Sequence, residues 1–360
     1  MKRTKHLFLL LLAAILLPFT TMSAQDVWDG TVATEFAGGT GTESDPYLIE
    51  TGAQLAYLAQ QTNQGYSGYY YKLIADIELN SDVLTADFEL NGTPANTWTP
   101  IGISNYFSGY FDGGNHIVSG VYVPESMNLQ FAGLFGRTTT AEIHHLAVVD
   151  TYVAATWGAG AIVGNVGYER TYKTTVHHCY AEARSCAIGN YNFLGAVVGH
   201  IDYYSIVQYC YASGYVTGTY NFGGIAGHSD RGNVLNSFST CKIGTGGKYV
   251  GGCIGQSYDA TATNLYFDKT KAPDIPVLGY GSGSNCEGKT TEEMFSQEFA
   301  DLLGEPFVYD GNNYPYIEGL PQVGEKSTIL NSGNRIYVGH LTNAEGSTFR
   351  FFGEYTDNPL

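Results

Sequence analysis

Five blocks of glycine and aliphatic residues recur along the sequence at a nearly constant interval. They are AGLFG ending at Gly136, GAIVG at Gly164, GAVVG at Gly199, GGIAG at Gly227 and GGCIG at Gly255. The last glycines of successive blocks are 28, 35, 28 and 28 residues apart, and the longer interval contains a polar insertion at 167–173. A fixed period of this length indicates a stacked repeat, in which each unit buries its apolar face only against its neighbours.

A second element follows each block and has the two-residue period of a β-strand. In the third unit, one face carries Cys210, Ala212, Gly214 and Val216, and the other carries Tyr211, Ser213, Tyr215 and Thr217. Small residues on one face and larger or polar residues on the other are typical of a half-buried strand. A β-propeller blade needs four strands and roughly 40 residues, which this period does not supply. We therefore predict an all-β fold, a parallel β-helix (β-solenoid) with strands stacked about 4.8 Å apart. We expect a right-handed coil, although the sequence does not fix the hand.

The start of the chain is typical of an export signal. Lys2, Arg3 and Lys5 precede an unbroken apolar run at 7–17. This pattern predicts a secretory signal peptide at 1–24. The run is shorter than the roughly 20 apolar residues that span a bilayer, and no other stretch is apolar enough to do so. We expect a secreted or cell-surface protein with no transmembrane span once the signal is removed.

Short helices are predicted at both ends of the repeat region, which would occupy 25–320. Thr51 and Gln54 form a capping box that begins a helix within an N-terminal cap at about 40–80. Thr290 and Glu293 form another, which begins a helix ending at Gly304 within a C-terminal cap at about 288–320. Such caps cover the strand edges that a solenoid exposes at its ends. Residues 321–360 are predicted to form a small β extension.

The net charge indicates which classes of partner are disfavoured, and the positions of the cysteines indicate whether they form disulfides. The formal net charge of −17 disfavours nucleic acid and anionic membrane surfaces as partners. Six cysteines in an exported chain permit disulfides. However, Cys179 and Cys210 occupy equivalent repeat positions, and Cys253 replaces an aliphatic residue of a glycine block. Buried thiols that pack in the core are therefore the favoured interpretation, with disulfides the alternative.

The acidic residues do not indicate a catalytic site. A polysaccharide lyase or hydrolase on this fold needs two carboxylates facing one groove. Asp150 falls at the repeat position of Ala183, Gly214 and Cys241, so acids do not form a column. The sequence also lacks H-E-x-x-H and G-x-S-x-G motifs. We predict a non-catalytic protein without a cofactor.

Two histidine pairs occupy one repeat position in neighbouring units. They are His144-His145 and His177-His178. Strand alternation would put one histidine of each pair outside, about 5 Å from its counterpart, which is near enough to share a metal if a third ligand were present. No acid or cysteine has a predicted place beside them. A polar ladder that continues through Asn236 and Asn264 is therefore favoured, and we predict no metal site.

An aromatic column is the predicted binding feature. One repeat position, on the face opposite the small core residues, is occupied in turn by Tyr180, Tyr211, Phe238 and Tyr266. Stacked once per coil and facing solvent, these rings would form a flat strip suited to sugar rings or a protein partner. Two alternatives are open: a self-supporting ladder that binds nothing, and a column that points inward.

The chain resembles the GLUG-motif repeat family, named for its glycine-aliphatic-glycine blocks. The resemblance rests on GLFG at 133–136, GGIAG at 223–227, and a lead-in of GTESDPYLI at 41–49, WTPIG at 98–102 and FSGYFDGGNH at 107–116. It implies a parallel β-helix in a bacterial, secreted or surface-displayed protein, and no catalytic residue. Some family members join these repeats to a zinc metallopeptidase that cleaves immunoglobulin A. The missing H-E-x-x-H motif means that this activity does not carry over.

The function predicted from these features is adhesion or recognition. A rigid solenoid face would bind a glycan or a protein of a host or neighbouring cell. A carbohydrate-active enzyme and an inert surface-layer or spacer element are the alternatives.

Overall fold

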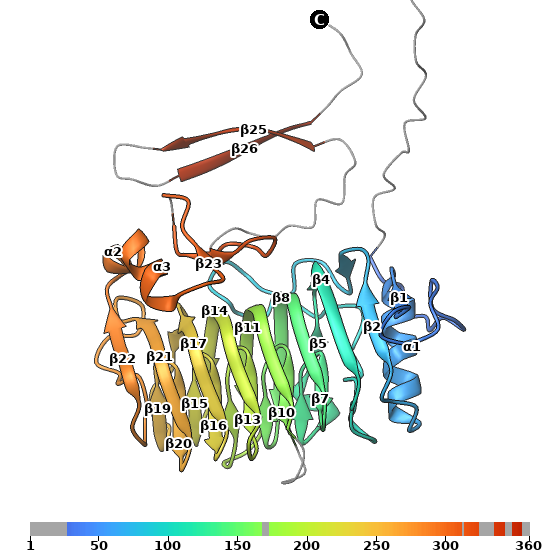
Figure 1. The fold of residues 1–360 in the computed structure, drawn as a ribbon, viewed down its shortest axis with the longest axis horizontal. Helices are drawn as coiled ribbons and strands as arrows, with labels where there is room; N and C mark the ends of the chain where they lie inside the picture. The colour runs from blue at the N-terminus through green and yellow to red at the C-terminus, as the bar shows by residue number, and fades with distance from the viewer. Residues whose placement is uncertain (1–26, 168–172, 312, 324–334, 343–347, 355–360) are drawn as a thin grey trace, which may run out of the picture. The chain divides into compact units, whose positions relative to one another are not determined.

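A computed structural model shows that the chain forms a parallel β-solenoid (Figure 1). The structure describes residues 27–167, 173–311 and 313–323, together with the backbone of 335–342 and 348–354. The predicted signal peptide, most of the polar insertion at 167–173 and parts of the predicted C-terminal extension lie outside these residues. The solenoid belongs to a compact unit at 25–329, and a second unit contains β25 (Arg335–Thr342) and β26 (Thr348–Glu354), which pair antiparallel.

Three parallel sheets wind around the core. The long sheet contains, in order, β1 (Tyr47–Ile49), β2 (Tyr70–Leu73), β4 (Tyr110–Ser119), β8 (Glu142–Ala155), β11 (Thr175–Ala187), β14 (Ile206–Thr217), β17 (Asn233–Ser239), β21 (Thr261–Asp268) and β22 (Ser284–Lys289). Beside this path lie β3 (Ile77–Glu78), β5 (Tyr122–Val123) and β18 (Lys242–Ile243). The first short sheet contains β6 (Phe131–Ala132), β9 (Gly158–Ala159), β12 (Phe193–Leu194), β15 (Asn221–Gly223) and β19 (Tyr249–Gly251). The second short sheet contains β7 (Phe135–Arg137), β10 (Val163–Val166), β13 (Val198–Ile201), β16 (Ala226–Asp230) and β20 (Ile254–Tyr258).

The glycine blocks form the corner between the two short sheets. A Cβ atom added to Gly227 would lie 2.1 Å from the backbone nitrogen of Leu194 in the preceding coil, and one added to Gly199 would lie 2.5 Å from that of Ala159. The two short sheets therefore approach more closely than any side chain at these positions would allow. The central residue of each block is fully buried in the core, as Ile225 is. Gly279 extends the glycine row by one coil, because its Cβ would lie 2.4 Å from the nitrogen of Val250.

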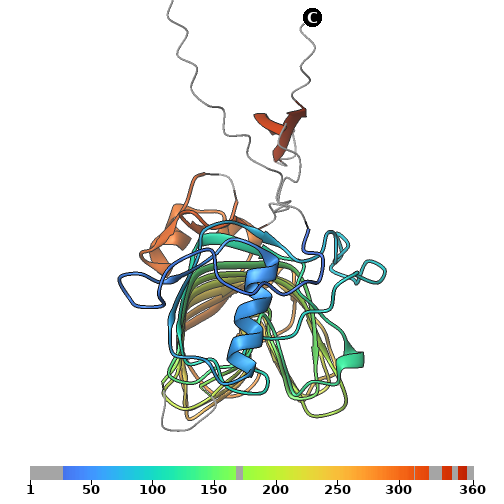
Figure 2. The ribbon, with the colours of Figure 1, turned by 90° about the vertical axis from the view of Figure 1, so that its right-hand side faces the viewer.

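The helix α1 (Gly52–Asn63) lies across the N-terminal end of the coil (Figure 2). Its predicted capping box is confirmed: the Thr51 side chain accepts a hydrogen bond from the backbone of Gln54, and the Gln54 side chain accepts one from the backbone of Thr51. Leu55 and Leu58 are fully buried in the main core cluster. Burial of this apolar face covers the end of the core that the first coil would otherwise expose.

The C-terminal segment of the solenoid unit returns along the outer face of the long sheet. Thr290 and Glu293 form the predicted capping box at α2 (Thr291–Met294), but the helix is shorter than expected. The side chain of Ser296 accepts a hydrogen bond from the backbone of Phe299 and begins a separate helix, α3 (Gln297–Leu303). β23 (Phe307–Val308) and β24 (Tyr316–Ile317) follow as an antiparallel pair. These elements lie over the long sheet (Figure 1).

The six cysteines are free thiols. Cys179 and Cys210 pair in register on neighbouring strands, and both are fully buried among apolar residues, as are Cys241 and Cys253 at the core. Cys186 and Cys286 are half-buried. The packing interpretation therefore holds for the four buried thiols, which fill core positions as small apolar side chains.

Candidate functional site

A ladder of residues in the left-handed conformation runs along one corner of the long sheet. Its members occupy one position in successive coils and have φ angles between 45° and 54°; they are His145, His178, Tyr209, Asn236, Asn264 and Asn285. The amide of Asn264 donates to the Asn236 side chain at 2.7 Å, and that of Asn285 donates to Asn264 at 3.0 Å. The rings of His145 and His178 stack with centroids 5.0 Å apart. The predicted polar ladder is confirmed, and asparagine suits it because its short side chain tolerates this backbone conformation.

The left-handed backbone brings each histidine pair together. In a regular strand His144 and His145 would point to opposite faces. Because His145 has a φ of 51°, the alternation is broken, and the two Nδ1 atoms lie 2.6 Å apart. His177 and His178 repeat this arrangement with the same Nδ1–Nδ1 distance, 2.6 Å. The sequence-based expectation that alternation would separate the members of a pair is therefore wrong.

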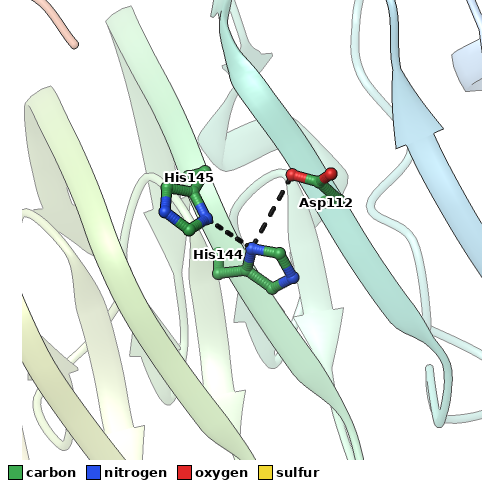
Figure 3. A group of neighbouring side chains, drawn as sticks. All are labelled: Asp112, His144 and His145. Atoms are coloured by element: carbon green, nitrogen blue, oxygen red, sulfur yellow. Dashed lines mark hydrogen bonds and ion pairs between the residues drawn. The ribbon is translucent and has the colours of Figure 1, made fainter. Parts of the chain in front are cut away.

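Asp112 lies beside the first histidine pair (Figure 3). It pairs in register with His144 on the neighbouring strand, and its Oδ1 atom is 3.7 Å from His144 Nδ1. Ligand atoms of Asp112, His144 and His145 all lie within 4.8 Å of one another. The sequence analysis missed Asp112 because it belongs to the lead-in coil, where the pairing of β4 with β8 shifts register between Asp112 and His116. The one feature of the sequence that could have drawn attention to Asp112 is its position immediately before Gly113 and Gly114.

Neighbouring groups hold Asp112 in place. The backbone N–H of Gly114 donates to Oδ1 at 2.8 Å, and the Lys72 ammonium lies 2.9 Å from Oδ2. Burial raises the pKa of the Asp112 carboxyl, but the hydrogen bonds from Gly114 and Lys72 and the charges nearby outweigh it and lower the pKa overall. Asp112 is therefore a carboxylate at neutral pH, with side-chain exposure of 30%.

The histidine rings beside Asp112 are held neutral. Burial lowers the pKa of His144 and of His145, and the neighbouring Asp112 carboxylate compensates for this only in part. Burial, followed by the charges of the neighbouring histidines, lowers the pKa of His178 to about 4. A neutral imidazole keeps one ring nitrogen with a free lone pair, the form in which histidine binds a metal.

The predicted aromatic column is buried. Its rings stack as expected, with centroids 4.7 Å apart for Tyr180 and Tyr211 and 5.5 Å apart for Tyr211 and Phe238. However, Tyr180, Tyr211 and Phe238 are 0% exposed and Tyr266 is 4% exposed. The expectation of a solvent-facing strip at these positions is wrong because the C-terminal segment covers the column.

Contacts with the C-terminal segment show how the column is covered. The Phe299 ring lies 5.5 Å from that of Phe238 and 5.4 Å from that of Tyr266. The Tyr211 hydroxyl donates to the carbonyl oxygen of Pro321 at 2.6 Å. The column is thus the floor of a second apolar core.

A different set of aromatic rings is exposed. Four of them lie at or just before strands of the first short sheet, and the fifth, Tyr280, follows Leu278, which bridges to Ile254 of the second short sheet. We call this set the aromatic strip, and it consists of Trp157, Tyr191, Tyr220, Tyr249 and Tyr280. Trp157 is 42%, Tyr191 52% and Tyr280 45% exposed, while Tyr220 and Tyr249 are partly exposed. The sequence analysis missed the strip because Tyr191 and Tyr280 lie in connections of different length, outside the two aligned elements.

Three of the four successive pairs of rings in the aromatic strip are in contact. Ring centroids are 6.2 Å apart for Trp157 and Tyr191, 4.1 Å for Tyr191 and Tyr220, and 5.0 Å for Tyr249 and Tyr280. Lys248 closes the remaining gap, with its ammonium 4.9 Å from the Tyr220 ring and 5.0 Å from the Tyr249 ring. With one ring per coil over five coils, the strip is about 19 Å long.

A pocket lies at the Tyr280 end of the aromatic strip. It has a volume of about 590 Å³, and its lining includes Ser257, Tyr258, Asp259 and Tyr280. This volume lies within the range of small-molecule sites. The guanidinium of Arg231 lies 3.7 Å from the Asp259 carboxylate, so the pocket has an acidic group with a basic neighbour.

Asp150 and Glu182 are two acidic residues whose charges interact. Asp150 forms a bulge, so Ala183 pairs with Thr151 and the predicted alignment of Asp150 with Ala183 is wrong. The backbone N–H groups of Val83 and Leu84 each donate to Asp150 at 2.7 Å, which gives this carboxylate a structural role. Burial, followed by the charge of Asp150, raises the pKa of Glu182 to about 7.

Comparisons with known proteins give one relative and one similar structure. No family model matches the chain. A protein of Evansella cellulosilytica described as a "Putative Gly-rich membrane protein" is 31% identical over 166 residues, which are 46% of this chain and 18% of that protein. A crystal structure described as "a putative immunoglobulin A1 protease" from Bacteroides ovatus has a TM-score of 0.49 and 19% identity, covering 79% of this chain and 96% of that one. Among the residues that the structure describes, no helix has both the length and the apolar character needed to cross a membrane.

Proposed function

We propose that this protein is a secreted or cell-surface recognition module that binds a glycan along the aromatic strip without catalysing a reaction. The observation that carries the proposal is the run of exposed and partly exposed rings from Trp157 to Tyr280, which Lys248 bridges between Tyr220 and Tyr249. Large exposed apolar patches on a protein commonly mark a site that binds a partner or a ligand.

The chemistry of the strip suits a sugar chain. Tyrosine and tryptophan offer an apolar ring face and a polar group at the edge, which match the apolar faces and the hydroxyls of a sugar ring. Trp157 and Tyr220 immediately precede strands of the first short sheet and Tyr249 begins one, so the spacing of these rings is set before binding and little conformational entropy is lost. The pocket at Tyr280 adds hydroxyl and carboxylate groups that could hold one terminal sugar.

Placement outside the cytoplasm rests on the sequence. Lys2, Arg3 and Lys5 followed by the apolar run at 7–17 have the pattern of a secretory signal peptide. The resemblance to the GLUG-motif family supports the same placement, as does the description of the Evansella relative as a membrane protein. The matched stretch is a small part of that relative, so its function as a whole protein is not transferred.

Glycan-array binding with purified protein tests this proposal. We expect Trp157→Ala and Tyr191→Ala each to weaken binding by at least about 5-fold, since one stacked ring contributes roughly 1–3 kcal/mol to binding. Tyr66→Ala is the matched control, because Tyr66 is 58% exposed and lies outside the strip. Chromatography of the glycan after incubation should show no new product.

Three results would contradict the proposal. Binding that Trp157→Ala and Tyr191→Ala leave unchanged would exclude the strip. Cleavage of a bound glycan would favour the enzyme alternative, and binding to no glycan or surface protein would favour an inert spacer.

A further inference from the structure

We propose that Asp112, His144 and His145 form a binding site for a divalent transition-metal ion such as Zn²⁺. The ligands would be Asp112 Oδ1 and the two Nδ1 atoms, with the remaining position open to water. This inference is independent of glycan binding, because the site lies on the long sheet and shares no residue with the aromatic strip.

The two facing histidine nitrogens are placed to share either a proton or a metal ion. The Nδ1 atoms of His144 and His145 face each other at 2.6 Å, an arrangement in which two lone pairs repel unless a proton or a metal ion lies between them. Ligand atoms around a tetrahedral zinc ion with Zn–N bonds of roughly 2.0–2.1 Å lie about 3.4 Å apart. Small ring rotations that open the 2.6 Å separation and shorten the 3.7 Å separation from Asp112 would reach this geometry.

Asp112 supplies the third ligand that the sequence analysis did not find. Its Oδ1 atom accepts one hydrogen bond, from Gly114, and keeps a second lone pair for a metal. The Lys72 ammonium lies 2.9 Å from Asp112 Oδ2, so it orients the carboxylate and leaves the proposed ligand atom, Oδ1, accessible to a metal. Two imidazoles, one carboxylate and an open position are a ligand set that zinc binds.

The second histidine pair is a natural comparison. His177 and His178 have the same Nδ1–Nδ1 separation of 2.6 Å. Their nearest acid, Glu142, lies 3.1 Å from His177 Nε2, which is not one of the two facing nitrogens. Among the residues that the structure describes, only the first pair forms a group with a carboxylate at its Nδ1 atoms, so we assign the metal to the first pair.

The test is titration of the untagged full chain with Zn²⁺ by isothermal calorimetry, in wild type and three variants. His145→Asn removes one ligand and keeps the left-handed backbone, because asparagine occupies the same ladder position in later coils. Asp112→Asn removes the carboxylate charge. His178→Asn is the matched control, since it makes the same substitution in the next coil.

We expect one Zn²⁺ per chain in wild type. His145→Asn and Asp112→Asn should each weaken binding by at least about 10-fold, while His178→Asn should change it by less than about 2-fold. X-ray absorption of the zinc-loaded wild type should show two imidazole ligands. No stoichiometric binding by wild type, unchanged binding in His145→Asn or Asp112→Asn, or an equal loss in His178→Asn would overturn the assignment.

Discussion

Replacing Gly227 with alanine should separate the two short sheets and destabilise the solenoid. The added Cβ would lie 2.1 Å from the nitrogen of Leu194 and 2.4 Å from the carbonyl carbon of Phe193, both backbone atoms of the preceding coil. Ordinary contact begins near 3.4 Å, so the sheets must move apart by about 1.3 Å. Overpacking of a core costs roughly 1–3 kcal/mol, and backbone atoms cannot rotate away as side chains do. We therefore expect a loss of about 3 kcal/mol or more in the free energy of unfolding.

Gly136→Ala is the matched control, since Gly136 ends the first glycine block. Its added Cβ would have its nearest neighbour, the Pro100 Cβ atom, at 3.4 Å. We expect a change of less than about 1 kcal/mol, because an alanine without steric conflict also lowers the entropy of the unfolded chain. Urea denaturation followed by circular dichroism measures both variants. Equal effects of the two substitutions would refute the explanation of the glycine blocks given above.

Three further predictions follow from buried groups. Burial lowers the pKa of His200 to about 4 and, together with the charge of His200, that of His228 to about 3. Since the unfolded chain binds these protons near pH 6.5 and the folded chain does not, the free energy of unfolding should fall by about 2 kcal/mol per histidine between pH 7 and pH 5. Urea titrations that give equal stability at the two pH values would contradict this. Phe238→Ala should cost about 3–5 kcal/mol and expose the C-terminal segment to limited proteolysis, because Phe238 is fully buried against Phe299 and Phe307. A variant as protease-resistant as wild type would argue against this cover. Thiol titration should count six reactive thiols in denaturant and leave the four fully or nearly fully buried ones unreactive in the native protein, and fewer than six in denaturant would reveal a disulfide.

The architecture was predictable because the period of a structural repeat can be read directly from the spacing of its recurring residues. The spacing of the glycine blocks gave the coil length, and alternation around Cys210 gave the inward face of the strand. Capping boxes at Thr51 and Thr290 located the helices, since this motif depends on residues three positions apart.

The candidate sites were less predictable because they depend on contacts between distant segments. Nothing near Tyr211 in the sequence indicates that the segment around Pro321 returns to cover it. Asp112 meets His144 through a register shift, and alternation fails at His145 because its backbone is left-handed. Periodicity describes regular strands, so it could not find sites formed where the regularity is broken.

The central claim is that successive coils lie in register, so that equivalent residues form straight rows. Lys72, Gln208 and Thr263 belong to one row of the long sheet, with Gln208 four strands and Thr263 six strands from Lys72. Double electron–electron resonance between spin labels at Lys72 and Gln208 should give a distance of about 19 Å, and between labels at Lys72 and Thr263 about 29 Å. An increase of about 10 Å between the two pairs is the predicted result. Equal distances, or a shorter distance for the Lys72–Thr263 pair, would contradict the solenoid.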